Sequence, residues 1–270
     1  MCVARWPDAG RSCDKVEIVL VALVNYFHAG DVILSRALIR RVRPLLIDRV
    51  ALELRCMARY AYLWEDLGLP IYGVQDAQHE PDVNVNVIDM WFGSSEDLLG
   101  VSGLTHATQV TSYNRRAAAL GLPILDPSEP VPPIDFPERT VRDEAGVLVE
   151  NGPVLSGQNT AELTPMLARL AEDFPRVPFY CTSKPPSGPS NLIDISSRNL
   201  VEISALSNSC RVMIARLSGP FVATLTHGNR GRLRRLVLGY PIGCPIWDET
   251  DVEYHTDWHY LQKRLKEILS

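Results

Sequence analysis

The sequence predicts an α/β protein made of two Rossmann-like domains that face each other across a cleft. Three observations support this fold class. A continuous apolar run at residues 16–24 has the composition of a parallel strand that is buried on both faces. Candidate strands and helices then alternate along both halves of the chain, which is typical of parallel sheets. Six prolines between Pro123 and Pro137 separate the two halves.

We place a flexible tail at residues 1–15 and the N-terminal domain at residues 16–122. Its expected strands are residues 16–24, 50–56, 71–74 and 83–90, and its expected helices begin at Gly30-Asp31, at residue 61 and at residue 105. The apolar run at residues 16–27 is shorter than the roughly 20 residues that a membrane span needs. Because it leads directly into a helix start, we favour a strand over a leader peptide.

Proline fixes φ and lacks an N–H group, so we expect residues 123–146 to form a semi-rigid linker. The C-terminal domain then covers residues 147–270, with strands expected at 147–149, 177–181, 192–195 and 211–215. Asn159 with Glu162, and Asn199 with Glu202, have the spacing of capping boxes at the start of two helices. Asp257 is expected to cap a C-terminal helix.

The charge balance limits the classes of partner. A net charge of −5 and a pI near 5.7 disfavour the binding of a polyanion, so we expect no nucleic acid partner. Four arginines lie within residues 230–235, where they either meet a phosphate group or form a solvated helix face. Because a run of charged residues usually forms a solvated surface, we favour the solvated helix face.

Cysteine and histidine spacing indicates a reducing compartment and no metal centre. The six cysteines form no C-x-x-C pair, and Cys181 and Cys210 lie in apolar runs as small buried residues do. We therefore expect a cytoplasmic protein. His255 and His259 are four residues apart, but His255 precedes the Asp257 cap, so we expect no metal there. Fingerprints of dinucleotide, P-loop and serine-hydrolase sites are missing, and we expect no cofactor.

In an open parallel sheet, ligands bind beyond the carboxyl ends of the strands. Three loops of the sequence occupy such places: residues 28–31, 151–159 and 216–220. In the last, Ser218-Gly219-Pro220 follows a strand and opens a helix, so its N–H groups and the helix dipole suit a diphosphate. The alternative is a tight turn in which Ser218 is the N-cap and Pro220 the first helical residue. Both interpretations remain open on the local pattern.

Asp31 is the carboxylate of most interest, because it follows the first strand and could take a proton from an acceptor hydroxyl. The alternative is a helix-capping role, in which the helix N-terminus would lower the pKa of the carboxyl group. Glu202 is explained by its capping box.

The stretches 25–32, 199–206, 210–215 and 218–220 resemble the heptosyltransferase-like glycosyltransferases of family nine. The stretch 150–159 looks closer to a separate bacterial branch of these proteins. The resemblance implies a GT-B architecture, with the acceptor bound by the N-terminal domain and the nucleotide sugar by the C-terminal domain. It also implies metal-independent, inverting sugar transfer in polysaccharide biosynthesis, with a glycan or lipid-linked acceptor and a peripheral contact with a membrane.

The resemblance places Asp31 as the catalytic base, with His28 and Gly30 on the acceptor side. The donor residues that it implies, together with those of the neighbouring loops, are Arg216, Ser218, Gly219, Pro220, Gly157, Gln158, Asn159 and Glu202. The family often has an aspartate immediately before the Ser-Gly pair, where this chain has Leu217. Two alternatives therefore stay open, a non-catalytic binding protein of the same shape and a nucleotide-sugar epimerase.

Overall fold

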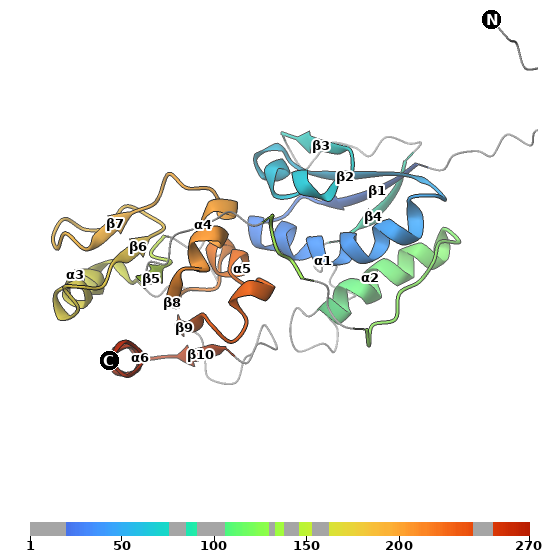
Figure 1. Cartoon of the computed structure of the whole chain (residues 1–270). Coiled ribbons are helices and arrows are strands. Elements are labelled where there is room, and N and C mark those ends of the chain that lie inside the picture. Colours follow the sequence, from blue (N-terminus) through green and yellow to red (C-terminus); the bar gives the residue numbers. More distant parts are fainter. Residues whose placement is uncertain are drawn as a thin grey trace, which may run out of the picture.

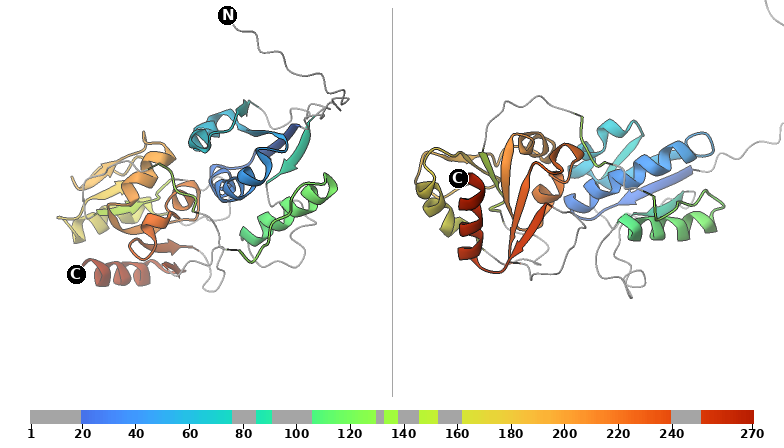
Figure 2. Two further views of the ribbon diagram at one scale, coloured as in Figure 1. Left: turned by 45° about the vertical axis from the view of Figure 1, so that its right-hand side comes forward. Right: turned by 60° about the horizontal axis from the view of Figure 1, so that its bottom comes forward.

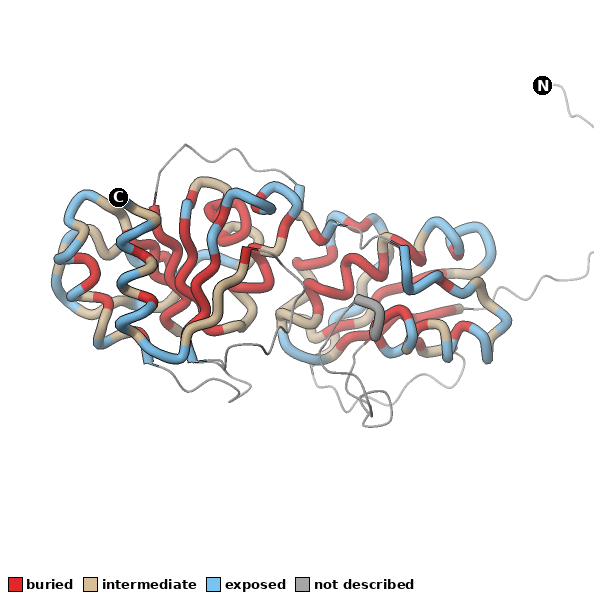
Figure 3. Tube along the Cα trace, turned by 90° about the horizontal axis from the view of Figure 1, so that it is seen from below, coloured by how far each residue is buried: buried red, intermediate tan, exposed pale blue. Residues whose placement is uncertain are grey.

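The computed structural model describes residues 20–75, 85–90, 106–129, 133–137, 146–152, 162–239 and 251–270. Two parallel sheets lie side by side, one from each half of the chain, and helices pack against both (Figure 1). The predicted α/β class and the two-sheet architecture are confirmed. Buried residues follow the strands of both sheets and the inner faces of the helices, while exposed residues lie on the outer helix surfaces (Figure 3).

The N-terminal sheet contains β1 (Leu20–Asn25), β2 (Ala51–Met57), β3 (Ile71–Val74) and β4 (Asn86–Asp89) in the order β3-β2-β1-β4. All three strand pairs are parallel. The helices α1 (Ala29–Leu46) and α2 (His106–Ala119) lie side by side against this sheet (Figure 1). Every strand predicted in this half is therefore present, and the predicted strand residues 16–19, 83 and 84 lie outside the described residues.

The helix expected at residues 61–67 is replaced by two short 3₁₀ helices, η1 (Ala58–Leu63) and η2 (Glu65–Leu67). Gly68, with a left-handed φ of 65°, stops the second one. About ten residues separate β2 from this glycine, and 3₁₀ turns are common in connectors of that length.

The C-terminal sheet contains six parallel strands in the order β10-β9-β8-β5-β6-β7. They are β5 (Gly146–Val149), β6 (Phe179–Cys181), β7 (Leu192–Asp194), β8 (Cys210–Ala215), β9 (Arg234–Leu238) and β10 (Val252–His255). Numbered from β5, this is the strand order of the doubly wound dinucleotide-binding fold. The strand order thus supports a Rossmann-like C-terminal half. The free thiols of Cys181 and Cys210 are buried, as the sequence predicts.

The helices of this half are α3 (Thr164–Asp173), α4 (Leu200–Ser207), α5 (Gly219–Ala223), η3 (His227–Asn229) and α6 (Trp258–Leu269). The Asn199–Glu202 capping box is confirmed, with reciprocal hydrogen bonds of 3.0 and 2.9 Å. Asp257 caps α6 as predicted, accepting a hydrogen bond from the N–H of His259 at 2.6 Å. The capping box at Glu162 is wrong, because α3 begins only at Thr164 and its N-cap is Leu163. Asn159 lies outside the described residues.

The solvated helix face expected at residues 230–235 is also wrong, because Arg234 and Arg235 belong to strand β9. The Arg235 side chain is fully buried, and its Nε donates a hydrogen bond to Thr224 Oγ1 at 3.0 Å. Both β9 and β10 are strands that the sequence pattern does not show.

The segment between α2 and β5 contains no helix or strand in its described residues, 120–129 and 133–137. It is fastened to α1 by arginines. Arg36 donates to the carbonyl oxygens of Ile134 and Asp135 at 2.9 and 2.7 Å, and Arg40 donates to that of Asp135 at 2.6 Å. Arg36 is fully buried and also forms an ion pair with Asp66 at 2.6 Å. None of the helices in the described ranges is both long and apolar enough to cross a bilayer.

Candidate active site

Both sheets have a switch point, where the chain reverses the direction in which it adds strands. In the N-terminal sheet it lies between β1 and β4, and in the C-terminal sheet between β5 and β8. Ligands of open α/β sheets bind beyond the carboxyl ends of the strands at such points. Two connections therefore carry the candidate site, the β1–α1 turn (residues 26–31) and the β8–α5 turn (residues 216–219).

The β8–α5 turn is shaped by a buried carboxylate. Glu150, which directly follows β5, is 1% exposed. One of its oxygens accepts a hydrogen bond from the N–H of Arg216 at 2.6 Å, and the other accepts one from the N–H of Ser218 at 3.1 Å and one from the Ser218 hydroxyl. Between these donors, Leu217 has a φ of 62°, the left-handed value that among the described non-glycine residues occurs here alone. A leucine in this conformation is strained.

Burial raises the pKa of Glu150, and the hydrogen bonds from Ser218 and Arg216 together with the Arg216 charge oppose that shift. The Arg216 guanidinium also reaches across to the carbonyl oxygen of Gly152, 2.8 Å away. The loops that follow β5 and β8 are therefore tied together from both sides.

Asn151 ties the loop after β5 to the loop after β6, on the other side of β5. Its amide group donates to the carbonyl oxygen of Ser183 at 2.9 Å and accepts from the Ser183 N–H at 2.9 Å. Glu150 and Asn151 thus fasten the two loops that flank the central strand. Sequence reasoning missed Glu150 as a site residue, although a carboxylate directly after the apolar strand Gly146–Val149 was a visible signal.

The β1–α1 turn is organised by buried Asn25. Its amide nitrogen donates to Ser35 Oγ at 2.7 Å, its amide oxygen accepts from the Phe27 N–H at 3.1 Å, and the Ser35 hydroxyl donates to the Asp31 carbonyl at 2.9 Å. His28 is the N-cap of α1 and is exposed, and Asp31 lies in the first helical turn. These bonds fix the point at which α1 leaves the sheet, and with it the position of Asp31.

Burial raises the pKa of Asp31, although the charge of His28 and nearby backbone N–H groups oppose the shift. The sequence suggested the opposite direction, because a helix N-terminus normally stabilises a carboxylate. Desolvation is the larger effect here. A carboxylate whose pKa is raised is a stronger base than an exposed one.

The starts of α1 and α5 lie side by side (Figure 2), and a glycine stands on each side of their contact. A Cβ atom added to Gly30 would lie 3.2 Å from Val222 Cγ2, and one added to Gly219 would lie 3.5 Å from the Cβ of Ala29. A further contact between the two halves of the chain is the hydrogen bond that the N–H of Leu200 donates to the Tyr62 hydroxyl at 3.5 Å. The starts of α1 and α5 are therefore in direct contact, and a Cβ atom at residue 30 would require Val222 to shift by a few tenths of an ångström.

The structure places the sequence-predicted residues as follows. His28, Gly30 and Asp31 lie together at the start of α1, and Arg216, Ser218, Gly219 and Pro220 lie together in and directly after the β8–α5 turn. Glu202 lies in the first turn of α4, where its carboxylate accepts a hydrogen bond from the Asn199 N–H. Gly157, Gln158 and Asn159 lie outside the described residues.

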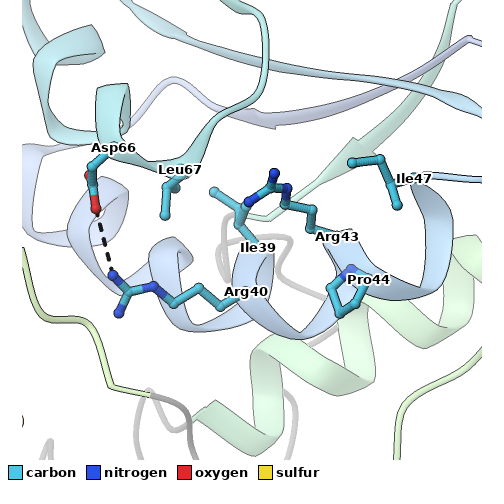
Figure 4. Close-up of a pocket in the computed structure, with 7 residues that line it drawn as sticks. All are labelled: Ile39, Arg40, Arg43, Pro44, Ile47, Asp66 and Leu67. Atoms are coloured by element: carbon cyan, nitrogen blue, oxygen red, sulfur yellow. Dashed lines mark ion pairs between the residues drawn. The ribbon is translucent and has the colours of Figure 1, made fainter.

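A separate groove of about 340 Å³ lies toward the C-terminal end of α1 (Figure 4). It is lined by Ile39, Arg40, Arg43, Pro44, Ile47, Asp66 and Leu67. Arg40 and Asp66 form an ion pair of 3.6 Å at its edge. The helix has 18 residues, about 27 Å in length, and Asp31 lies in its first turn. The groove is therefore distinct from the place where the two turns meet. In the parts of the chain that the structure describes, no cluster of three or more His, Cys, Asp or Glu side chains is arranged to hold a metal ion.

No protein-family model matches the sequence. The comparison with curated proteins gives no match either.

Solved structures share the fold. A family 9 glycosyl transferase from Veillonella parvula is 13% identical, with a TM-score of 0.56 over 92% of this chain and 90% of that one. The E. coli heptosyltransferase WaaC, solved with ADP, is 9% identical, with a TM-score of 0.58 over 92% and 99% of the two chains. The E. coli ADP-heptose LPS heptosyltransferase II is 12% identical, with a TM-score of 0.51 over 93% and 98%. At these identities the likeness establishes the two-domain GT-B fold.

Proposed function

We propose that this protein transfers a sugar from a nucleoside diphosphate sugar to a hydroxyl acceptor. The observation that carries the proposal is the contact between the two helices that follow the switch points, which brings the start of α1, with the partly buried Asp31, against the start of α5 at Gly219. One member of this fold, WaaC, was solved with ADP. A nucleotide at the β5–β8 switch point would therefore face a carboxylate from the other domain.

In the proposed reaction, the acceptor oxygen attacks the anomeric carbon of the donor sugar, and its proton passes to the Asp31 carboxylate. The bond between the anomeric carbon and the diphosphate oxygen breaks, and the nucleoside diphosphate leaves. Direct displacement inverts the configuration at that carbon. The raised pKa of Asp31 favours proton uptake in the transition state.

Negative charge grows on the leaving diphosphate, so the donor side needs positive potential. The cationic Arg216 and the absence of a side chain at Gly219 support this assignment for the β8–α5 turn. We propose that no metal ion is required, because Arg216 supplies the charge. Gln158 and Asn159 are proposed as further donor contacts, and Pro220 as a fixed start for α5.

The acceptor is proposed to be a glycan or lipid-linked hydroxyl, bound beside His28 and Gly30. One structure of the same fold is described as an LPS heptosyltransferase. Such an acceptor would bring the protein to a membrane surface from the cytoplasmic side. Glu202, whose hydrogen bond to Asn199 caps α4, is proposed to act only indirectly, by holding α4 against α5.

A second candidate, a non-catalytic binding protein, is favoured by one observation. The Ser218 N–H and hydroxyl both donate to Glu150 and so are engaged within the protein. This candidate predicts nucleotide binding without turnover, or no nucleotide binding at all. An epimerase, by contrast, would convert the donor sugar in the absence of any acceptor.

The test begins with thermal unfolding in the presence of ADP, UDP, GDP and their sugars. A ligand at 100 times its Kd adds about 2.7 kcal/mol to the unfolding free energy. Turnover of the donor that binds is then measured for wild type, Asp31→Asn and Asp48→Asn, the last at an exposed position of the same domain. We expect Asp31→Asn to bind the donor but to lose about 100-fold or more of the transfer rate. Equal rates in all three proteins would rule out Asp31 as the base.

A further inference from the structure

We infer that Glu150 is the positioning residue of the donor site, and that its negative charge holds the β8–α5 turn in the shape that receives the diphosphate. The inference rests on the proposed function. It starts from the fact that a single buried carboxylate accepts three hydrogen bonds from this turn, two from N–H groups and one from a hydroxyl. The carboxylate faces these three donors and is 1% exposed, so Glu150 does not itself contact a substrate.

The turn needs such an anchor because its backbone is strained. Leu217 adopts a left-handed φ of 62° between Arg216 and Ser218, the two residues whose N–H groups Glu150 accepts. A leucine adopts this conformation only where the surroundings impose it. The carboxylate on one side of the turn and the Arg216–Gly152 bond on the other supply that constraint.

The β8–α5 turn leads into the start of α5, which packs directly against the start of α1, so the position of the turn affects the position of Asp31. Ser218 is followed by Gly219, where an added Cβ atom would lie 3.5 Å from the Cβ of Ala29 at the start of α1, two residues before Asp31. Release of Ser218 would therefore change both the donor turn and its distance from the base. Charge matters as well as shape, because a neutral glutamine presents one acceptor oxygen and one N–H₂ group to three donors.

The experiment compares wild type with Glu150→Gln, Glu150→Asp and Glu253→Gln. Glu253 provides a matched control in the same domain, because its carboxylate is paired with Arg264 at 2.8 Å on the edge strand β10. Hydrogen exchange of the amides of Arg216 and Ser218 reports on the turn without any ligand. Binding of ADP, UDP and GDP by calorimetry, and the separate kcat and KM of transfer, report on the site.

For Glu150→Gln we expect exchange at Arg216 and Ser218 to accelerate at least tenfold and nucleotide affinity to fall about tenfold or more, as for the loss of hydrogen bonds to a charged group. Glu150→Asp keeps the charge and should retain part of the amide protection and part of the nucleotide affinity. Glu253→Gln should match wild type in amide exchange and in nucleotide affinity. Fast exchange with unchanged nucleotide affinity and kcat would overturn the inference, as would unchanged exchange. A wild-type protein that binds none of the three nucleotides would instead refute the proposed function and this role with it.

Discussion

Replacing Gly30 with valine tests whether the contact between the two turns sets the geometry of the site. The Cβ of an alanine would already lie 3.2 Å from Val222 Cγ2, a distance that requires a shift of a few tenths of an ångström. Valine adds two more methyl groups at the same place, and overpacking of this kind costs about 1–3 kcal/mol. The starts of α1 and α5 would relieve it by moving apart by about 1 Å, and a misplacement of that size can reduce turnover roughly 100-fold.

The assay measures sugar transfer and urea unfolding for Gly30→Ala, Gly30→Val and Gly188→Val. Gly188 is the control, because a Cβ added there meets nothing closer than Ala168 Cβ at 4.0 Å. We expect Gly30→Ala to stay near wild type in stability, since the helix gains about 0.5–1 kcal/mol from the loss of glycine. Gly30→Val should lose both stability and turnover. Full turnover and stability in Gly30→Val would refute the view that this contact fixes the site.

Three further predictions concern stability. Burial raises the folded-state pKa of Asp31 above its ordinary 3.8, so the contribution of Asp31 to stability is present below pH 3.8 and is lost as pH rises through the folded pKa. Asp31→Asn should therefore be more stable than wild type at pH 7. In thermal melts, the difference in stability between the two proteins should close toward pH 3. Arg36→Met removes a fully buried guanidinium that holds Asp66 and the carbonyls of Ile134 and Asp135. In urea titrations it should lower the unfolding free energy by about 3–5 kcal/mol. A loss below 1 kcal/mol would mean that this network is solvated. Asn199→Ala removes the cap of α4 and should cost about 1 kcal/mol in the same titration, and no loss would show that the capping box is not formed in solution.

Local patterns predicted the strands that are uniformly apolar, such as β1 and β5, because burial on both faces leaves that signature in a short stretch of sequence. Strand β9 escaped prediction because Arg234 and Arg235 open it. The buried Arg235 guanidinium donates hydrogen bonds to Thr224, eleven residues away in the sequence. That compensation depends on tertiary packing, which a local window does not contain.

In the candidate site too, the features that depend on local sequence were predicted and those that depend on tertiary packing were not. The strand-to-helix connections at Asp31 and Ser218 were visible in the sequence, because each follows an apolar run and opens a helix. The role of Glu150 was not, since it depends on the pairing of β5 with β8, which brings together residues more than sixty positions apart. The helix-capping interpretation of Asp31 implied a lowered pKa, and this is wrong for the same reason, because the desolvation that raises the pKa comes from the folded chain around it.

A crystal structure with a bound nucleoside diphosphate from the stabilising panel would test the central claim most directly. The account predicts the diphosphate beyond the carboxyl ends of β5 and β8, beside Gly219, with the Asp31 carboxylate across from it. A diphosphate bound in the groove between Arg40 and Ile47, or at any other place away from the two turns, would contradict the account.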